Sequence, residues 1–586
     1  MCGIFGYIGT NQHAGSMILD GLKTLEYRGY DSWGVAAKKD DGSLFIEKHV
    51  GKIGDASLPS FKTHIGIGHT RWATHGGVTD KNAHPHTDCT KKIVIVHNGI
   101  VENFETLKAD LKKKKHTFVS ETDSEVIAHL IEEMYKTEPN KVKVMQKLRS
   151  KITGLNAVIA FFPEDESIYI IKNGSPIVVG EGDNGYFIAS DTSAIIAHTK
   201  RISFLEDDEM LELANGGIKL FDRNAKVQKV SFTSLEYSAK SAEKGTFKHF
   251  MLKEISEQPQ ILRNIVETQK TEIKKAADKI KNAYGTYLIG CGTASYACLA
   301  GTYLFSKIAH RHINFAIGSE FSYLHDFLKE NSLVFALSQS GETIDIISSV
   351  KKAKEKKAQL LSLTNSQGSS LYRMSDHNLL LHAGPEKAVA STKAYTAKIS
   401  FLYLIAHELD GSFDMGKTNM KKAIDEISTL IENKSTIKSL AAKIKNNKSV
   451  FILGRGVSYA AALESALKIK EVSYIHAEGF AAGELKHGVI ALIEKGTPVI
   501  LFNPEDETYE DTLSAAHEVS ARGAHVIGVS SKNDKVYDTF IEVKNCGDAT
   551  IIPNVVIAQL LGYFLALEKG LDPDKPRNLA KSVTVK

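Results

Sequence analysis

The first 235 or so residues alternate short apolar runs of strand length with polar, glycine-bearing turns. Runs such as CGIFGYIG, IGIGHTRWA, KIVIVHNG and SIYIIKNG predict strands, because strands carry a few apolar or alternating residues between turn signals. Apolar residues at helical spacing interrupt them and predict helices over about 14–26, 101–115 and 123–151. Strands in runs, then helices in runs, are typical of a layered α+β domain, which we place at residues 1–236.

From about residue 250 onward, short apolar strands alternate with longer amphipathic helices. The strands include YLIGCG, LVFALS and AQLLSLTN, and later SVFILGRG, PVILF and HVIGVSS. This alternation is typical of parallel, doubly wound α/β sheets. Between the two patterns, SAKSAEKGT lacks large apolar residues, so residues 237–249 are predicted to form a linker.

The second half also repeats itself. GCGTASYACLAG at Gly290 resembles GRGVSYAAALES at Gly454, and SLTN at Thr364 resembles GVSS at Ser530, at nearly the same offset. Two copies of one α/β domain explain both landmarks. We place the copies at 250–415 and 439–576, with a C-terminal tail at 577–586.

Composition is that of an ordinary globular protein, with 42% hydrophobic and 24% charged residues. A net charge of +4, from 73 basic and 69 acidic residues, gives no argument for a nucleic acid or a membrane as a partner. Five sparse cysteines argue against a disulfide framework and for a reducing, cytoplasmic compartment.

Two segments bear on targeting. The N-terminus has neither the basic nor the apolar region of a signal peptide. The longest apolar stretch, 551–567, contains Pro553, Asn554 and Gln559, so we predict a buried helix rather than a membrane span.

Candidate chemistry begins at Cys2. Removal of Met1 would make Cys2 the first residue, and its α-amine, with an ordinary pKa of about 7.7–8.0, could accept the thiol proton. Taken alone, Cys2 is better explained as a small buried residue of the first strand. However, the segments GHTRWATHG, NAHPH, HNGIVENF and SETDSEV are polar, carry glycines and border predicted strands.

These segments hold the groups that an amino-acid amide would need. Arg71 offers a planar fork for a carboxylate, and Asp123 offers the opposite charge for an ammonium. Asn98 and Gly99 offer a side-chain amide and a backbone N–H, the parts of an oxyanion hole. Together they could hold an amino acid at both ends and attack its side-chain amide.

CGIFGYIG, LEYRGYDS, GHTRWATHGG, HNGI and SETDSEV resemble the glutaminase domain of the N-terminal-nucleophile amidotransferases, an αββα sandwich. The resemblance implies that Cys2 is the nucleophile that releases ammonia from glutamine, with Asn98 and Gly99 holding the oxyanion. Arg71 and Asp123 would bind the α-carboxylate and α-amine of glutamine. The other pocket residues would be Trp72, Thr74, His75 and Gly76, with Trp72 between the glutaminase and the ammonia route.

His84 and His86 form an H-x-H pair, which could suggest a metal site. The pair matches the NAHPH turn of the same family, and no Cys or carboxylate cluster completes a ligand set in the sequence. We therefore expect no metal.

The motif SQSGET follows a predicted strand and precedes a predicted helix. Its donors, Ser338, Gln339, Ser340 and Thr343, would crowd onto a helix N-terminus, a phosphate site by geometry and dipole. It also lies at the carboxyl end of a strand, where open α/β sheets bind ligands. A plain helix cap is the alternative. The equivalent place in the second copy, LFNPEDE, is acidic, so only the first copy is predicted to bind phosphate.

Glu464, Lys468 and Glu471 are spaced i, i+4 and i+7, so they lie on one helix face. A salt-bridged solvent face would explain them, but apolar neighbours and the preceding glycine turn argue against it. The glycine-bearing segment at 476–488 suggests a shaped loop. The C-terminal NLAKSVTV carries apolar anchors that would dock it.

The whole chain resembles the glutamine–fructose-6-phosphate aminotransferase (isomerising) family, a glutaminase followed by two sugar-isomerase domains and ending PRNLAKSVTV. The resemblance implies that Lys581 forms a Schiff base with the open-chain ketose. Glu471 would move a proton between C1 and C2 with help from Lys468, and His487 would open the ring, from a partner subunit. The 6-phosphate would be held by Ser338, Gln339, Ser340 and Thr343, and the sugar site lined by Thr293, Val389, Ser391 and Ala580.

The same resemblance implies glutamine and fructose 6-phosphate as substrates, a homodimer, and no pyridoxal phosphate or other cofactor. The chain departs from the family at four places: Trp33, Ala294 and Lys586 replace the usual alanine, serine and glutamate, and KHGVIALI replaces KHGPLALI.

Two alternatives belong to other classes. A different glutamine amidotransferase would share the first domain but lack SQSGET and the repeat. A catalytically silent sugar-phosphate-binding regulator would tend to have lost Cys2, Glu471 or Lys581, and all three are present.

Overall fold

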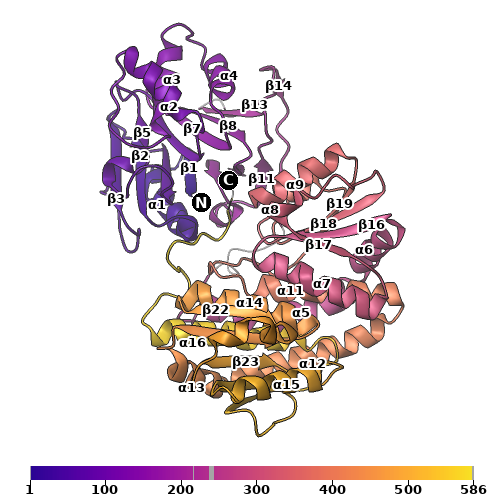
Figure 1. The fold of residues 1–586 in the computed structure, drawn as a ribbon. Helices are drawn as coiled ribbons and strands as arrows, with labels where there is room; N and C mark the ends of the chain where they lie inside the picture. The colour runs from indigo at the N-terminus through magenta and orange to yellow at the C-terminus, as the bar shows by residue number, and fades with distance from the viewer. Residues whose placement is uncertain (1, 215–216, 236–242, 584–586) are drawn as a thin grey trace. The chain divides into compact units, whose positions relative to one another are not determined.

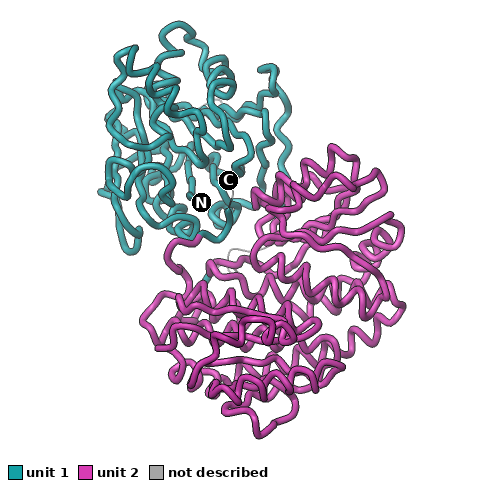
Figure 2. The backbone as a smooth tube through the Cα atoms, in the orientation of Figure 1, with its two compact units in different colours: residues 1–243, 580–586 teal, residues 244–579 magenta. Residues whose placement is uncertain are grey.

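The computed structural model describes residues 2–214, 217–235 and 243–583, which form two compact units (Figures 1 and 2). Unit 1 comprises Met1–Glu243 with Ala580–Lys586, and unit 2 comprises Lys244–Leu579. The predicted domain end at 236, positions 237–242 of the predicted linker and positions 584–586 of the predicted tail lie outside the described residues. Residues 243–249 form neither helix nor strand.

Unit 1 is built on two antiparallel sheets. The first has the order β15-β11-β9-β10-β1-β4-β2-β3 and the second β14-β13-β12-β8-β7-β6-β5. The first sheet consists of β1 (Gly3–Gly9), β2 (Ser32–Lys38), β3 (Leu44–Val50), β4 (Ile65–Arg71), β9 (Val178–Gly182), β10 (Gly185–Ala189), β11 (Arg201–Phe204) and β15 (Thr233–Ser234). The second consists of β5 (His86–Thr87), β6 (Val94–Gly99), β7 (Asn156–Phe162), β8 (Ser167–Asn173), β12 (Met210–Ala214), β13 (Gly217–Phe221) and β14 (Val227–Gln228).

Helices cover the outer faces of both sheets. Ile4 and Ile67 of the first sheet and Val96 and Ile159 of the second share one buried core between the sheets. A second core joins α1 (Ala14–Leu25) to the first sheet. A third joins α2 (Phe104–Lys113), α3 (Glu125–Tyr135) and α4 (Lys141–Lys151) to the second sheet. The unit is therefore layered as helix, sheet, sheet and helices, as expected of an α+β layered domain.

The single helix predicted over 123–151 is wrong, because the structure has two helices there, α3 and α4. Pro139 stands between them, and a proline disfavours helical conformation in the residue before it. Asn140 then caps α4, its side chain accepting the backbone N–H of Lys143 at 3.2 Å. The apolar pattern ran through this break because both helices pack on the same core.

Unit 2 contains two parallel five-stranded sheets with the orders β17-β16-β18-β19-β20 and β22-β21-β23-β24-β25. The first consists of β16 (Gly285–Gly290), β17 (Asn314–Ile317), β18 (Ser332–Ser338), β19 (Gln359–Thr364) and β20 (His377–Leu380). The second consists of β21 (Ser449–Gly454), β22 (His476–Ala481), β23 (Pro498–Phe502), β24 (His525–Ser530) and β25 (Thr539–Glu542).

The helices of the first copy are α5 (Phe250–Thr268), α6 (Lys270–Asn282), α7 (Thr293–Ala309), α8 (Gly318–Phe321), α9 (Ile344–Glu355), α10 (Ser370–Met374) and α11 (Lys393–Asp410). Those that follow are α12 (Phe413–Glu432), α13 (Ser435–Ile444), α14 (Val457–Ser473), α15 (Tyr509–Ser520) and α16 (Ile551–Glu568).

The two sheets confirm the internal repeat. In each, the first strand of the copy lies between the second and the third, and the fourth and fifth follow in order. The first strand of each copy leads into a glycine of nearly identical conformation, Gly292 with φ +54° and Gly456 with φ +55°. An L side chain rarely adopts this conformation, so glycine is needed at the same step of both copies.

One expectation for the second copy is wrong. The segment 476–488 was predicted to be a loop, but its first six residues form β22, the edge strand paired in parallel with β21. The strand carries Gly479, and a Cβ there would lie 2.7 Å from the Ala462 carbonyl oxygen. Its glycine marks close contact with α14 rather than a turn.

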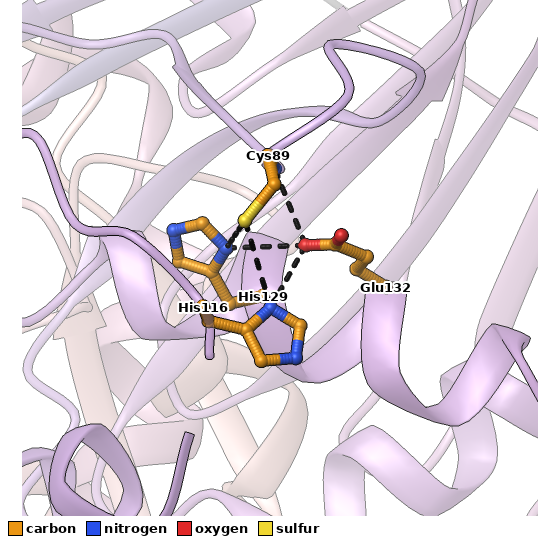
Figure 3. Close-up of side chains that lie close together, drawn as sticks. All are labelled: Cys89, His116, His129 and Glu132. Carbon is orange, nitrogen blue, oxygen red and sulfur yellow. Dashed lines mark hydrogen bonds and ion pairs between the residues drawn. The ribbon is translucent and has the colours of Figure 1, made fainter. Parts of the chain in front are cut away.

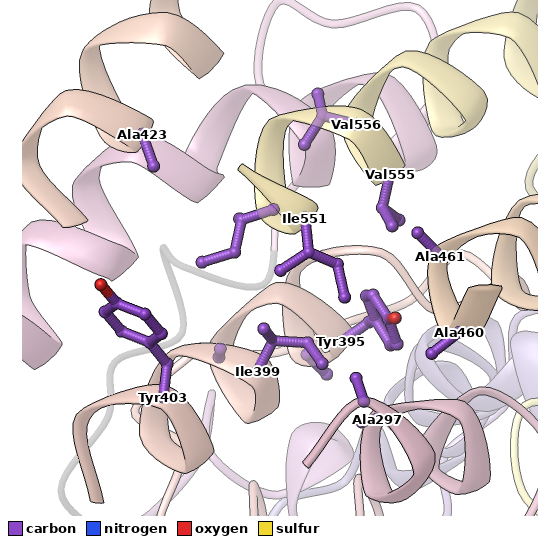
Figure 4. Packing of buried hydrophobic residues seen from close by; sticks show 14 of the residues in the cluster. Ala297, Tyr395, Ile399, Tyr403, Ala423, Ala460, Ala461, Ile551, Val555 and Val556 are labelled. Atoms are coloured by element: carbon purple, nitrogen blue, oxygen red, sulfur yellow. The ribbon is translucent and has the colours of Figure 1, made fainter. Parts of the chain in front are cut away.

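The apolar stretch near the C-terminus forms α16, the predicted buried helix. By length and composition it could span a membrane, but 94% of its most apolar window is buried inside unit 2. Its Ile551, Val555 and Val556 share a core with Tyr395 of α11 and Ala461 of α14 (Figure 4). The helix therefore belongs to the core of this unit.

Candidate active site

Cys2 directly precedes β1 and is half-buried. Its Sγ accepts the backbone N–H of Trp72 at 3.2 Å and lies 3.6 Å from the Trp72 carbonyl oxygen. Gly3 donates its N–H to Thr70 Oγ1, and β1 pairs with β4, so the sheet itself brings Cys2 to the loop after β4. Burial raises the pKa of the Cys2 thiol, whereas the Trp72 N–H and the Arg71 charge lower it.

Arg71 ends β4, and the loop after it carries the other predicted glutamine-binding residues of this segment, Trp72, Thr74, His75 and Gly76. The guanidinium of Arg71 donates to the carbonyl oxygens of Gly77 and Gly76, each at 3.1 Å, and to that of His75. These hydrogen bonds hold the backbone of the loop around the Arg71 side chain. Burial lowers its pKa, and the nearby Cys2 thiol and Asp123 carboxylate act in the opposite direction.

Asn98 and Gly99 end β6 beside Cys2. Asn98 Nδ2 donates to the Cys2 carbonyl oxygen at 3.1 Å, and Asn98 Oδ1 lies 3.1 Å from His69 Nε2. Burial lowers the pKa of His69 to about 3, so a neutral imidazole orients this amide. Gly99 has φ +137°, and a Cβ there would lie 1.9 Å from the Leu155 carbonyl oxygen, so only glycine fits.

Asp123 lies just before α3 and is 3% exposed. Its Oδ2 accepts the backbone N–H of Val101 at 2.8 Å. Asn82, to which the sequence analysis assigned no role, joins the neighbouring loops. Its Nδ2 donates to the Gly77 carbonyl oxygen at 3.0 Å and to Glu121 Oε2 at 3.1 Å, and its Oδ1 accepts the Glu121 N–H at 2.9 Å.

The rings of His84 and His86 both contact other protein side chains. The ring of His84 stacks on His69 with 4.0 Å between centroids, and His86 Nε2 lies 3.1 Å from Thr122 Oγ1. Burial holds the pKa of both well below the ordinary value, so both are neutral near pH 7. The pair is thus part of a buried histidine layer beside Asn98.

The hydroxyl groups of SQSGET gather at the N-terminus of α9. Ser338 ends β18, and its Oγ lies 3.1 Å from Oγ1 of Thr343, the residue before α9, and accepts the Gly341 N–H at 3.0 Å. Ser340 Oγ accepts a backbone N–H of the same turn, and Gln339 is half-buried between the two serines. The turn therefore combines hydroxyl donors with a helix N-terminus at the carboxyl end of a parallel strand.

A cluster of buried charges lies on α14, where the spacing of Glu464, Lys468 and Glu471 placed them on one face. Lys468 is 0% exposed, and its Nζ lies 2.5 Å from Glu471 Oε2, 3.5 Å from Glu464 Oε1 and 3.0 Å from Thr293 Oγ1. Thr293, at the start of α7, also donates to Glu464 Oε1 at 3.3 Å. The solvent-face alternative is therefore wrong for Glu464 and Lys468.

The protonation of this cluster follows from burial. Burial raises the pKa of Glu464 to about 8, so this carboxyl holds a proton near pH 7. Burial by itself would lower the pKa of Lys468, but the neighbouring acidic side chains, including Glu471 with its short hydrogen bond, raise it, so Lys468 stays protonated. Its short contact is with Glu471, whose side chain is 19% exposed. The cluster contains one cation, one accessible carboxylate and one neutral carboxyl.

The remaining predicted sugar-site residues of unit 2 are not all brought together. Val389 donates its N–H to the Asp574 carbonyl oxygen at 3.0 Å, and Ser391 Oγ donates to Glu386 Oε2 at 3.0 Å. Glu386 also lies close enough to Lys468 to raise its pKa, which connects this segment to the α14 cluster. His487 is exposed at the end of the 3-10 segment Ala482–His487 and takes no part in the cluster.

Ala580 and Lys581 belong to unit 1, whereas the other predicted sugar-site residues belong to unit 2. The placement of Lys581 and Ala580 at the sugar site therefore stays a prediction.

Comparison with known proteins gives matches to two family models. A glutamine amidotransferase domain matches residues 69–197, and a SIS domain matches residues 279–408 and again 443–541. The chain is 41% identical to the glutamine–fructose-6-phosphate aminotransferase (isomerizing) of Pyrococcus horikoshii and 40% identical to that of Thermococcus kodakarensis, in each case over 100% of both chains. The chain belongs to the glutamine–fructose-6-phosphate aminotransferase family.

A solved structure agrees with this membership. The C-terminal domain of glucosamine-fructose-6-phosphate aminotransferase from Francisella tularensis is 32% identical, covers 57% of this chain and 100% of its own, and has a TM-score of 0.54. The two SIS matches coincide with the two parallel sheets of unit 2, so the repeat and the family describe the same segments.

Sequence reasoning about this aminotransferase family member missed three supporting residues. Asn82 and His69 orient the loops and the amide around Cys2, and Glu386 accepts hydrogen bonds from the segment that carries Ser391. Asn82 lies within the quoted motif NAHPH, and His69 lies within GHTRWATHG. Their closeness in sequence to the candidate residues was the signal that could have identified them. Glu386 had no such signal.

Proposed function

We propose that this chain makes glucosamine 6-phosphate and glutamate from glutamine and fructose 6-phosphate. The observation that carries the proposal is full-length identity of about 40% to named enzymes of this activity, over both the glutaminase part and the sugar-isomerase part. Neither a different amidotransferase nor a silent sugar-phosphate-binding regulator accounts for that likeness together with Cys2, Glu471 and Lys581.

The glutaminase half starts with the thiol of Cys2. After loss of Met1, the α-amine of Cys2 takes the thiol proton, and Sγ adds to the side-chain carbonyl carbon of glutamine. Asn98 Nδ2 and the Gly99 N–H would hold the resulting oxyanion, and the single Nδ2 hydrogen bond to the Cys2 carbonyl oxygen leaves a second N–H for this role. The C–N bond breaks, ammonia leaves with the proton, and water releases glutamate from the thioester.

Binding of glutamine would use the charges beside Cys2. The Arg71 guanidinium would bind the α-carboxylate, and Asp123 would bind the α-ammonium. The Asp123 carboxylate raises the pKa of Arg71, so the two side chains interact within one site. Trp72, Thr74, His75 and Gly76 would complete the pocket wall. Support for these roles comes from the loop that Arg71 holds in place and from the link between the loops through Asn82.

The sugar half would use the tail lysine and the α14 cluster. Lys581 would form an imine with C2 of the open-chain ketose and lose water, and ammonia would then replace the lysine at C2. Glu471 would remove a proton from C1 and return it at C2, giving the aldose amine. Its exposure beside the cationic Lys468 suits an ionised base that faces a ligand, whereas Glu464 is buried and neutral.

The sugar would be positioned by groups of both copies. Ser338, Gln339, Ser340 and Thr343 would hold the 6-phosphate at the N-terminus of α9. Thr293, Val389, Ser391 and Ala580 would line the sugar site, and His487 of the partner subunit would open the ring. Its exposure in this chain supports a role outside the α14 cluster.

We also propose the finer architecture. Unit 1 would be an N-terminal-nucleophile fold, which its four layers support, and the two sheets of unit 2 would be doubly wound. We keep 1–236, 250–415, 439–576 and 577–586 as the proposed domains and tail. A homodimer, a cytoplasmic location and the lack of a pyridoxal cofactor stay predictions.

Product analysis tests the function. Glutamine plus fructose 6-phosphate should give glucosamine 6-phosphate and glutamate in equal amounts. Cys2→Ala should abolish glutamine hydrolysis while the sugar interconversion survives. Borohydride added with fructose 6-phosphate should trap one sugar adduct on Lys581, and Lys581→Arg should lose both adduct and synthesis, because a guanidinium forms no imine.

Two matched variants serve as controls, Cys291→Ser and Lys575→Arg, and both should keep full activity. Glutamine hydrolysis by Cys2→Ala would contradict the assigned nucleophile. An adduct on another lysine would show that the tail is a structural strap only.

A further inference from the structure

Four metal-ligating side chains of three kinds converge at one place in unit 1, on the helical side of the second sheet (Figure 3). Cys89 follows β5, His116 follows α2, and His129 and Glu132 lie three residues apart on α3. Their ligand atoms all lie within 4.8 Å of one another. The side chains of His116 and His129 are each 1% exposed.

Four of the six distances between these ligand atoms are close to those around a tetrahedral ion. Cys89 Sγ lies 3.7 Å from His116 Nδ1 and 3.5 Å from His129 Nδ1. Glu132 Oε2 lies 2.9 Å from His116 Nδ1 and 3.2 Å from His129 Nδ1. Around tetrahedral Zn²⁺, ordinary bond lengths place sulfur and nitrogen ligands ~3.6 Å apart and nitrogen and oxygen ligands ~3.3 Å apart.

The far nitrogens of both histidines face carboxylates. His116 Nε2 lies 3.1 Å from Glu133 Oε2, and His129 Nε2 lies 3.6 Å from Glu125 Oε1. Histidines that bind a metal through one nitrogen donate the other N–H to a carboxylate or a carbonyl, which fixes the tautomer. The His116 ring is oriented in this way, and the His129 ring faces its carboxylate at a longer distance.

The position of the proton on each histidine ring favours a bound ion over a cluster held by hydrogen bonds alone. If neutral histidines donated Nδ1–H to Glu132, each Nε2 would carry a lone pair toward a carboxylate. With a cation bound at Nδ1, each ring keeps its proton on Nε2, where His116 can donate to Glu133 Oε2 at 3.1 Å and His129 faces Glu125 Oε1 at 3.6 Å.

We propose that Cys89, His116, His129 and Glu132 form a structural Zn²⁺ site, with Glu133 and Glu125 as outer partners. Four protein ligands fill a tetrahedron, which is typical of structural rather than catalytic zinc. The thiolate and two imidazoles favour zinc over the hard cations Mg²⁺ and Ca²⁺. The sequence analysis expected no metal because it considered only His84 and His86.

The ion would join the β5–β6 loop, the segment after α2 and helix α3. Asp123, the proposed partner of the glutamine α-amine, lies just before α3. Loss of the ion should therefore raise KM for glutamine more than it lowers the rate of sugar isomerisation. This consequence rests on the proposed function, whereas the metal site itself does not.

Metal analysis of the full chain is the direct test. Protein expressed with added zinc and dialysed against a weak chelator should retain about one zinc ion per chain. Co²⁺ added to the stripped protein should give the visible bands of a tetrahedral ion and a sulfur-to-cobalt charge-transfer band. Removal of zinc should lower the melting temperature of unit 1 by about 8 °C or more.

Variants separate this site from other ligands. Cys89→Ser should lose the charge-transfer band, and His129→Ala should lose the bound zinc. Glu133→Gln should keep the site but weaken zinc binding by about 10–100-fold. Cys291→Ser is the matched thiol control and should match the unmodified chain.

Three results would overturn the proposal. One is less than about a tenth of an ion per chain after zinc-supplemented expression. The second is a charge-transfer band that survives in Cys89→Ser or disappears in Cys291→Ser. The third is zinc binding that Glu133→Gln and His129→Ala leave unchanged. Because these readouts need no activity, they separate this proposal from the proposed function.

Discussion

Helices α7 and α14 occupy the same step of the two copies in unit 2, yet one buries apolar side chains and the other buries charges. Each helix follows a glycine of nearly identical conformation and has 17 residues. At the positions where α14 carries Glu464 and Lys468, α7 carries Ala300 and Leu304, both buried in the apolar core. At the position of Glu471, α7 carries Lys307, which pairs with acidic residues nearer the surface.

The difference separates what the fold needs from what the chemistry needs. A buried ion pair is often no more stabilising than apolar side chains of similar volume, because both charges lose their hydration. The α7 pattern shows that this architecture is satisfied by apolar residues at these positions. The charges on α14 are therefore explained by ligand chemistry rather than by folding.

Giving α14 the pattern of α7 should produce the largest effect. We expect the double variant Glu464→Ala/Lys468→Leu to lose amino-sugar synthesis by about a thousandfold, because the cation beside Glu471 is gone. Its free energy of unfolding should be unchanged or higher by about 1–4 kcal/mol. Steady-state synthesis and denaturant unfolding measure the two effects.

The single variant Lys468→Leu is the control for that pair. It should destabilise unit 2 by about 1–3 kcal/mol, because the buried Glu464 carboxyl loses its contact with Lys468 and faces an apolar side chain instead. A double variant as unstable as the single one would mean that the charges support the fold, and the comparison between the helices would fail.

The reverse exchange, Leu304→Lys in α7, should destabilise the protein by about 3 kcal/mol or more. Leu304 is 1% exposed within the apolar cluster, so an ammonium there loses its hydration. Thermal unfolding measures the loss, and Lys307→Leu, at a half-exposed site, should change stability by about 1 kcal/mol or less. Full stability of Leu304→Lys would show that α7 tolerates charge as α14 does.

The turns before α9 and α15 allow a second comparison of the two copies, for which we expect an effect of intermediate size on sugar binding. Thr343 and Thr508 immediately precede these helices. Thr343→Ala should weaken fructose 6-phosphate binding by about tenfold, because a hydrogen bond to a charged group is lost. Thr508→Ala should leave sugar binding unchanged. Calorimetry of sugar binding without glutamine distinguishes them, and equal effects of the two variants would contradict a phosphate-binding role specific to Thr343.

The last effect concerns the pH dependence of stability, and it is small for each pH unit. Glu464 has a folded pKa of about 8, above its value of about 4.3 when unfolded. Between these values the folded state binds more protons, so Glu464 contributes stability at low pH that is lost as pH rises toward 8. Stability of the unmodified chain should fall relative to Glu464→Gln by at most about 1.4 kcal/mol per pH unit in this window. Parallel pH profiles would mean that Glu464 is ionised when folded.

Local pattern predicted most strands of both units, because alternation and apolar runs are properties of a few neighbouring residues. It missed β5, β9 and β11–β15 of unit 1 and β17 and β22 of unit 2, and it joined α3 and α4. All of the missed strands but β22 have two to five residues, so their pattern is weak. The run through Pro139 kept its periodicity because α3 and α4 share one core.

For the candidate sites, sequence identified the residues but not their neighbours. The i, i+4, i+7 spacing placed Glu464, Lys468 and Glu471 on one face, yet Thr293, which completes the cluster, comes from the other copy. The spacing from Cys89 to His116 and His129 matches no short metal motif. Only the packing of α2 and α3 beside the loop after β5 brings them together.

The sequence by itself determined the order of elements, the two-copy organisation and the chemical groups available near Cys2 and in SQSGET. These follow from periodicity, turn residues and motifs, which depend on residues close together along the chain. The tertiary structure decided which charges are buried, that Glu464 holds a proton, and that Cys89 and His116 lie beside His129 and Glu132 of α3. Burial and convergence depend on neighbours far apart along the chain, whose contacts form only when the sheets and helices pack.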